Sequence, residues 1–241
     1  MIGFAYKSNH KTETTMKQLD ENQKINVEAL MSQLLKRKTI TGRFKLPYTF
    51  EQTKDMLTAC VMAEVAFRHQ EYKKNQDMES YIDRTARWLN DGGTFGLLLC
   101  GVPGNGKTTL MRAIQTLVNM IDIKNIYDQP VAMITVDARE ITRLNRDSYD
   151  QFKAIRNREM LGIDDLGIEP TEVMDYGNIL NPVIDLLSYR YNEQLFTIVT
   201  TNLRPNEIRD KYKDRIADRF NEMMTKIIFK NESYRSPRLQ K

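Results

Sequence analysis

The segment Gly101-Val-Pro-Gly-Asn-Gly-Lys-Thr108 restricts the possible folds more than any other, because it fits the phosphate-binding pattern G-x-x-x-x-G-K-[ST]. The apolar run 95–100 before it has the length of a buried strand, and residues 109–118 after it have the spacing of a helix. Glycines in such a loop let backbone N–H groups point at phosphate oxygens, and the helix N-terminus adds positive potential. This context predicts a nucleotide-binding site.

Two side chains of this loop, the P-loop, have roles that follow from the pattern. We expect Lys107 to reach the β- and γ-phosphates and the hydroxyl group of Thr108 to bind Mg²⁺. The residues expected to contact the nucleotide here are Gly101, Pro103, Gly104, Asn105, Gly106, Lys107, Thr108 and Thr109.

Strands and helices alternate through the rest of the chain. The expected strands are 95–100, 131–136, 160–165, 196–201 and 226–229. Helical patterns separate them, for example at 138–145 and 179–192, whereas 146–158 reads as a polar span. This alternation predicts an α/β fold with a parallel sheet flanked by helices, and an apolar fraction of 41% is enough to form its core.

The N-terminal part has a different pattern. Apolar residues recur at three- and four-residue steps across 16–38, which predicts an amphipathic helix, and 39–48 reads as a linker. Two further helices are expected at 50–75 and 78–90. The expected domains are a helical partner-binding region with its linker at 1–48 and a nucleotide-binding domain at 49–241, which has a helical lead-in at 49–93 and a P-loop core at 94–241.

Composition narrows the class of protein. The formal net charge of +4 is compatible with nucleic-acid binding but does not establish it. The two cysteines, Cys60 and Cys100, lie far apart and are expected to be buried thiols in a reducing compartment. Neither a signal peptide nor an apolar run long enough to span a bilayer is evident in the sequence, so we expect a cytoplasmic protein with no membrane partner.

A pair of carboxylates ends the expected strand 160–165. A carboxylate at the C-terminal end of a core strand downstream of a P-loop is where Mg²⁺ is held, usually through water. We assign this role to Asp164, and we expect Asp165 to polarise the attacking water. Two adjacent carboxylates repel each other unless a cation is present, which itself indicates a metal-bearing site.

Polar residues after the strand 196–201 are further candidates. Asn202 can hydrogen-bond both the γ-phosphate and the attacking water. Arg215 and Arg219 lie four apart on one face of an expected helix, and one of them is a candidate to neutralise charge on a phosphate that a neighbouring subunit holds. The alternative is a solvated helix face on which these arginines pair with Asp214 and Asp218.

The order of these parts resembles that of the AAA+ ATPases of the DnaC-type bacterial replicative helicase loaders, and the IstB-type transposition helper ATPases are similar too. The motifs that carry the resemblance, over about residues 90–240, are the P-loop, Asp164-Asp165, Thr200-Thr-Asn202, Asp214-Arg-Ile-Ala-Asp-Arg-Phe220 and Ser233-Tyr-Arg-Ser236. The resemblance implies ATP and Mg²⁺ as ligands. It also implies that Asn202 is the first sensor, Arg219 (or Arg215) the arginine finger and Arg235 a second, nucleotide-contacting sensor.

One departure concerns the carboxylate pair. Many AAA+ proteins have Asp-Glu after the third strand, whereas this chain has Asp164-Asp165. The side chain of Asp165 is about one methylene shorter, so we expect slow, switch-like hydrolysis. A non-hydrolysing nucleotide-gated adaptor is the extreme form of this expectation.

The resemblance implies an ATP-dependent DNA replication factor. It would bind single-stranded DNA, form a nucleotide-dependent homo-oligomer and deliver a replicative DNA helicase held by the N-terminal helix. An IstB-like helper would instead have a transposase as partner. A small-molecule P-loop kinase is a further alternative, but it leaves Asn202 and Arg235 without roles.

The span between the second and third strands is a candidate for DNA contact. Its basic residues, with Tyr149 and Phe152 interleaved, are Arg139, Arg143, Arg146, Lys153 and Arg156. Single-strand binders combine phosphate-tracking basic residues with aromatic rings on which bases stack. An ordinary surface helix has a similar composition, so both readings stay open.

Overall fold

The computed structural model describes residues 26–35, 43–125, 128–170, 173–175 and 178–234. Its contacts divide the chain into two units, Met1–Thr41 and Gly42–Lys241. In the first unit the described element is the helix α1 (Val27–Leu35), whose first turn is capped by the side chain of Asn26, which accepts a hydrogen bond from the backbone N–H of Ala29 at 3.0 Å. The rest of the helix expected at 16–38 lies outside the described residues. The domain division at 48/49 stays a prediction.

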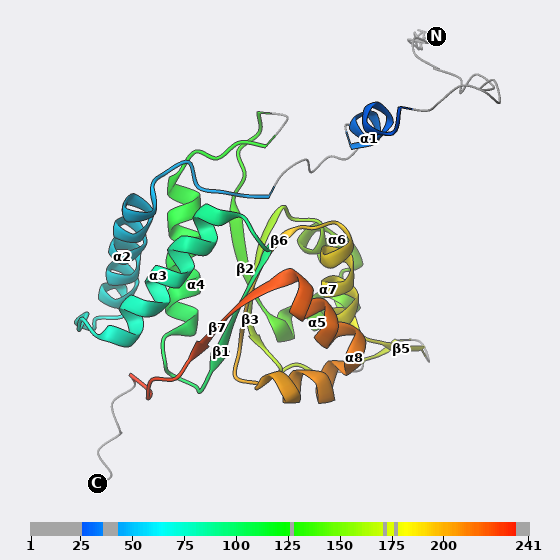
Figure 1. The fold of residues 1–241 in the computed structure, drawn as a ribbon. Helices are drawn as coiled ribbons and strands as arrows, with labels where there is room; N and C mark the ends of the chain where they lie inside the picture. Colours follow the sequence, from blue (N-terminus) through cyan, green and yellow to red (C-terminus); the bar gives the residue numbers. More distant parts are fainter. Residues whose placement is uncertain (1–25, 36–42, 126–127, 171–172, 176–177, 235–241) are drawn as a thin grey trace, which may run out of the picture. The chain divides into compact units, whose positions relative to one another are not determined.

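The second unit is built on a five-stranded parallel sheet with the order β2-β3-β6-β1-β7 (Figure 1). Its strands are β1 (Gly96–Gly101), β2 (Met133–Asp137), β3 (Met160–Leu166), β6 (Phe196–Thr201) and β7 (Met224–Phe229). Two short strands, β4 (Val173–Asp175) and β5 (Asn178–Leu180), pair separately in antiparallel fashion. The predicted α/β fold is confirmed, and each expected strand is present within two residues of its expected bounds.

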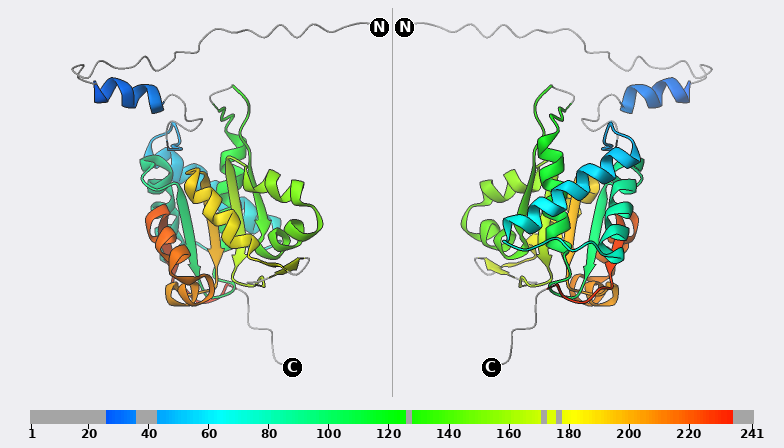
Figure 2. Two further views of the ribbon diagram at one scale, coloured as in Figure 1. Left: turned by 90° about the vertical axis from the view of Figure 1, so that its right-hand side faces the viewer. Right: turned by 90° about the vertical axis from the view of Figure 1, so that its left-hand side faces the viewer.

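Helices cover both faces of the sheet (Figures 1 and 2). The helices of one face are α2 (Phe50–Phe67), α3 (Gln76–Asp91) and α4 (Lys107–Met120), and those of the other are α5 (Ala138–Asp147), α6 (Tyr149–Arg156), α7 (Pro182–Asn192) and α8 (Pro205–Met223). Successive side chains of a strand point to opposite faces, so in β1 Leu97 and Leu99 join one core while Leu98 and Cys100 join the other. Burial on both faces explains why the strands read as continuous apolar runs. None of the described helices is long and apolar enough to cross a membrane.

The expected helix 50–75 is too long. The structure ends α2 at Phe67, and His69 has a positive φ of 55°, which is incompatible with a continuing right-handed helix. Asn75 then starts α3, because its side chain accepts a hydrogen bond from the backbone N–H of Met78 at 2.8 Å. The expected stop of α3 is confirmed at Gly92, which adopts the left-handed conformation with φ 61°.

The interpretation of 146–158 as a polar span is also wrong, since the whole of α6 lies within it. This helix has only Phe152 fully buried, so eight residues carry too little apolar periodicity to reveal it. The helix α8 is a merged pair, because Lys213 has non-helical angles (φ 68°, ψ 169°) inside it. The expected helix that carries Arg215 and Arg219 is therefore the part of α8 that follows the kink.

Candidate nucleotide-binding site

The P-loop connects the C-terminal end of β1 to the N-terminus of α4, and its glycines have conformations that its shape requires. Gly101 has φ 152°, and a Cβ atom there would lie 2.4 Å from the side-chain nitrogen of Asn105 and 2.6 Å from the carbonyl oxygen of Phe229. Gly106 has φ 99° and forms the start of α4. The backbone therefore turns tightly at both ends of the loop, as phosphate-binding loops do.

Lys107 is buried and its ammonium group ties the loop together. It donates hydrogen bonds to the carbonyl oxygens of Gly101 and Val102, at 2.6 and 2.8 Å, and to the side-chain oxygen of Asn105 at 3.0 Å. It also donates to the side-chain oxygen of Asn202 at 2.9 Å. Because β6 lies next to β1 in the sheet, the residue that follows β6 meets the loop although it lies 95 positions away in the sequence.

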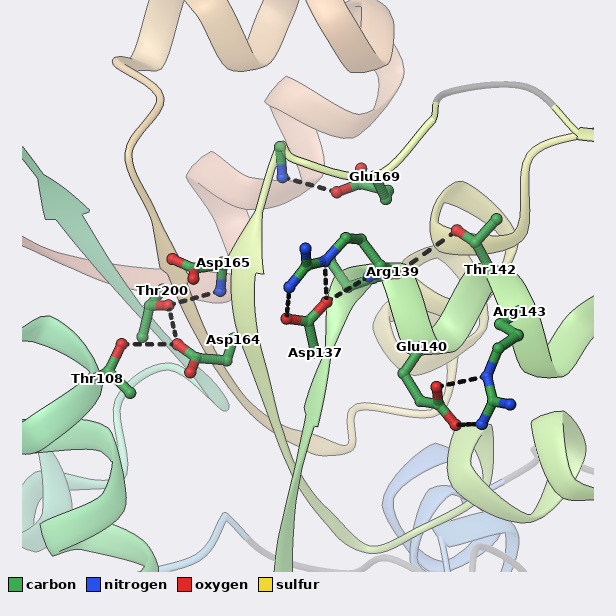
Figure 3. Close-up of polar contacts among 12 residues, drawn as sticks. Thr108, Asp137, Arg139, Glu140, Thr142, Arg143, Asp164, Asp165, Glu169 and Thr200 are labelled. Atoms are coloured by element: carbon green, nitrogen blue, oxygen red, sulfur yellow. Dashed lines mark hydrogen bonds and ion pairs between the residues drawn. The ribbon is translucent and has the colours of Figure 1, made fainter. Parts of the chain in front are cut away.

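Thr108 and Asp164 also meet. The hydroxyl group of Thr108 donates to Asp164 Oδ1 at 2.9 Å, and the hydroxyl group of Thr200 donates to the same oxygen at 2.6 Å (Figure 3). Carboxylate and hydroxyl oxygens are the ligands that Mg²⁺ prefers, usually together with phosphate oxygens and water. The side chains of Thr108 and Asp164 therefore fit a magnesium ion bound with a nucleotide.

Asp165 has an unusual backbone conformation. Its φ is 54°, in the left-handed region, and the register of β3 against β6 shifts between Ile163 and Leu166. This bulge lets the N–H group of Asp165 donate to Thr200 Oγ1 at 2.9 Å. The hydroxyl group of Thr200 thus links the Asp164 carboxylate to the Asp165 backbone, and both carboxylates lie beside it (Figure 3).

The surroundings of Asp165 favour its protonated form. Burial raises the pKa of its carboxyl group above the usual value, and the negative charges of Asp164 and Asp137 raise it further. The positive charges of Lys107 and Arg139 lower the pKa and only partly offset these causes. A carboxylate with a raised pKa is a stronger proton acceptor, which suits a group that polarises water.

Asp137 belongs to the same site, and sequence reasoning missed it. It ends β2 and lies opposite Asp164 in the β2–β3 register. Its carboxylate accepts hydrogen bonds from the guanidinium group of Arg139 at 3.0 and 2.9 Å (Figure 3). Asp137 and Asp164 both line a cavity of about 650 Å³, whose other lining residues come mostly from α4. The signal that would have found it is its place at the end of a strand, because the C-terminal ends of parallel strands meet at one edge.

The two candidate finger arginines lie on the part of α8 that follows its kink. Arg215 is exposed. Arg219 is half-buried, with its guanidinium carbon 4.9 Å from the ring centroid of Tyr191, and its Nη1 atom has no hydrogen-bond partner among the described residues. Arg235 lies outside the described residues, but the N–H group of Tyr234 donates to the carbonyl oxygen of Gly104 at 2.9 Å.

The basic residues of α5 and α6 mostly have local partners. The ion pairs of α5 are Arg139–Asp137, Arg143–Glu140 and Arg146–Asp147. On α6, Lys153 lies over the ring of Tyr149 and Arg156 over the ring of Tyr189. Such pairing reduces the positive charge available to DNA phosphates, so these contacts favour the surface-helix reading of this span.

A family model described as "Protein of unknown function (DUF815)" matches residues 43–230. The crystal structure of the DnaC helicase loader is similar at 22% sequence identity and a TM-score of 0.52, over 66% of this chain and 93% of that one. A putative primosome component from Streptococcus pyogenes serotype M3 is similar at 18% identity and a TM-score of 0.50, over 73% of this chain and 98% of that one.

A search of curated proteins found no match. At these low identities the two structural matches establish the fold alone. The predicted fold, a P-loop with a parallel sheet flanked by helices, is therefore confirmed, together with its likeness to the fold of the DnaC helicase loader.

Proposed function

Because the chain belongs to the DUF815 family of proteins of unknown function, we propose its function from its site: an ATPase that acts as a nucleotide-dependent switch in DNA replication. The proposal rests on two hydrogen-bonded links between distant segments. Lys107 binds Asn202, and Thr108 binds Asp164. These links bring the phosphate-binding, metal-binding and sensing side chains to one edge of the sheet, and ATP hydrolysis requires all three.

Each side chain has a defined part in the proposed reaction. Lys107 and the loop N–H groups bind the phosphates, and Thr108 with Asp164 holds Mg²⁺, which neutralises charge on the phosphate oxygens. Asp165 orients and polarises the attacking water. Asn202, already hydrogen-bonded to Lys107, contacts the γ-phosphate and so distinguishes ATP from ADP. Arg235 contacts the nucleotide from the C-terminal segment.

A neighbouring copy of the chain completes the site in this proposal. The exposure of Arg215 supports it as the arginine finger, whereas Arg219, which the resemblance implies, is half-buried against Tyr191. Both are therefore to be tested. A finger supplied by a second copy makes the assembly nucleotide-dependent, because the finger then contacts the phosphate that the first copy holds.

We further propose that the partner is a replicative DNA helicase and that the ATP-bound form binds single-stranded DNA in the cytoplasm. The similarity to the fold of a helicase loader supports the first part. The helix α1 supports it too, because Val27 and Met31 are 73% and 55% exposed and offer an apolar surface to a partner. Co-purification with a hexameric helicase tests this proposal, and capture of a transposase instead would favour the transposition-helper alternative.

ATP hydrolysis by the purified chain, with and without single-stranded DNA, tests the core of the proposal. Lys107→Ala should abolish ATP binding, while Lys124→Ala, which removes an exposed lysine paired with Asp128, should change nothing. Asp165→Asn should bind ATP normally and hydrolyse it about 10²–10⁴-fold more slowly. A wild-type chain that neither binds nor hydrolyses ATP would refute the proposal.

Mixed subunits identify the finger. Lys107→Ala subunits have intact arginines but no nucleotide site, whereas Arg215→Ala subunits have an intact site. A mixture of the two should recover hydrolysis that neither shows alone if Arg215 acts on a neighbouring subunit. The same experiment with Arg219→Ala tests the other candidate, and normal hydrolysis by both single variants would exclude an arginine finger on α8.

A further inference from the structure

Glu169 is a buried carboxylate to which the proposed reaction gives no role. It is only 2% exposed and follows Asp165 by four residues. Its Oε2 atom accepts a hydrogen bond from the N–H group of Gly167 at 2.8 Å (Figure 3), and its Oε1 atom accepts one from the hydroxyl group of Tyr212. A buried carboxylate is costly unless it is hydrogen-bonded and paired, so these partners hold it in place.

Lys211 fixes the same segment from α8. Its ammonium group donates to the carbonyl oxygens of Gly167 and Glu169, at 2.6 and 2.7 Å, and lies 3.9 Å from the Glu169 carboxylate. Burial and the Glu169 charge both raise the pKa of the Tyr212 hydroxyl, so it remains a donor at all ordinary pH values. Two consecutive residues of α8 thus hold the segment 167–169 through a cation and a hydroxyl group.

This contact joins two parts of the proposed site. On one side, the held segment begins two residues after Asp165, whose backbone is in the left-handed conformation. On the other side, Tyr212 directly precedes the kink at Lys213, and the second part of α8 carries the exposed Arg215. Arg209 bridges the kink, because its guanidinium group binds both Asp214 and Asp218 beyond it. Arg209 thus links the first part of α8, which carries Lys211, to the part beyond the kink.

We propose that Glu169, Lys211 and Tyr212 form a clamp that transmits contact between α8 and a second copy of this chain to Asp165, so that assembly accelerates hydrolysis. The inference rests on the proposed ATPase function and names the regulation of that site. The three side chains are positioning residues, because they act on the backbone that follows Asp165. We infer that the partner of α8 is a second copy of this chain, because the second part of α8 carries the exposed Arg215. This arginine is the candidate finger for a phosphate that another subunit holds.

Hydrolysis per subunit, measured from dilute to concentrated protein, tests the clamp. The wild-type rate should rise at least tenfold as subunits assemble. Lys211→Met and Tyr212→Phe should lose this rise, while their rate in dilute solution and their affinity for ATP stay within twofold of the wild type. Lys213→Met is the matched control, since among the described residues this amine reaches only the carbonyl oxygen of Asp210, in its own helix, at 3.5 Å. A normal rise in Lys211→Met would overturn the clamp, and so would an equal loss at all concentrations.

Hydrogen–deuterium exchange gives a second readout that does not need hydrolysis. With a non-hydrolysable ATP analogue, amides of the segment 164–170 should exchange more slowly in concentrated than in dilute wild-type protein. Lys211→Met should abolish this difference, whereas Lys213→Met should keep it. A wild-type chain that shows the difference but does not hydrolyse ATP would refute the proposed ATPase, while still showing that assembly affects the segment 164–170. If the exchange rates of these amides in the wild type do not depend on protein concentration, the clamp is refuted.

Discussion

Replacement of Thr200 by valine is the most direct perturbation of the carboxylate pair. Valine has nearly the same shape as threonine but lacks the hydroxyl group. The change removes the 2.6 Å hydrogen bond to Asp164 and the 2.9 Å hydrogen bond from the N–H group of Asp165. Thr108 still donates to Asp164, so the proposed Mg²⁺ ligands remain in place.

The magnitude follows from the contacts that are lost. A hydrogen bond to a charged acceptor contributes about 1.5–3 kcal/mol and an ordinary one about 1 kcal/mol, so Thr200→Val should lower the free energy of unfolding by about 2–4 kcal/mol. Asp165 keeps a left-handed conformation that costs a residue other than glycine about 1–3 kcal/mol. Loss of the hydrogen bond from its N–H group leaves this conformation less favoured by about 1 kcal/mol, which reduces the hydrolysis rate about fivefold.

Thr200→Ser is the matched control, because serine keeps the hydroxyl group and loses only the methyl group. Urea unfolding gives the stability of both variants, and steady-state hydrolysis gives their rates at saturating ATP. We expect Thr200→Val to lose rate and stability with ATP affinity unchanged, and Thr200→Ser to keep most of both. Equal effects of the two substitutions would show that the methyl group, and not the hydroxyl bridge, is what the site needs.

Three further predictions concern other parts of the molecule. Arg190 is fully buried and donates to three backbone carbonyl oxygens, so Arg190→Met should destabilise the fold by about 3–5 kcal/mol in urea unfolding; a loss below 1 kcal/mol would contradict this. The pKa of Asp165 is raised, so the acidic limb of the pH–rate profile should lie above the usual aspartate range, and Arg139→Gln should move it to higher pH because that arginine lowers the pKa. The raised pKa also means that Asp165 stabilises the fold while it is protonated, and this stability is lost as the pH rises through its folded-state pKa. Most aspartates show the opposite pH dependence, because their pKa is lowered on folding. Gly101→Ala should abolish ATP binding because the new Cβ would lie 2.4 Å from a side chain, whereas Gly93→Ala, with nothing within 4 Å, should bind normally.

The predictable part of the site is the part encoded locally. The P-loop needs glycines at fixed positions, and Lys107 and Thr108 follow from them. The position of Asp164 was predictable because it follows a short apolar run, and such a run is typical of a buried strand that ends at the carboxylate. The placement of Lys107 and Asn202 at one edge also follows once the strands are parallel, because the C-terminal ends of parallel strands share an edge. Their direct contact depends further on the pairing of β6 with β1.

The unpredicted part depends on backbone geometry and on distant pairing. No local sequence pattern indicates the left-handed backbone conformation of Asp165, because this conformation accompanies the register shift of β3 against β6. The approach of Asp137 to Asp164 depends on the pairing of β2 with β3, which the sequence does not specify. The position of Glu169 depends on its hydrogen bond with Tyr212, which lies 43 positions away in the sequence.

The conformation of position 165 gives a physical reason for an aspartate where many AAA+ proteins have a glutamate. Among residues other than glycine, aspartate and asparagine adopt the left-handed region most readily, because their short polar side chains can hydrogen-bond locally. A glutamate would reach further toward a nucleotide but would fit this backbone less well. At position 165, where φ is 54°, aspartate therefore suits the backbone better than glutamate does. Its side chain is shorter and the pKa of its carboxyl group is raised, and both properties affect how it can polarise the attacking water. Slow hydrolysis that a neighbouring copy accelerates through the Glu169–Lys211–Tyr212 clamp is the behaviour expected of such a site.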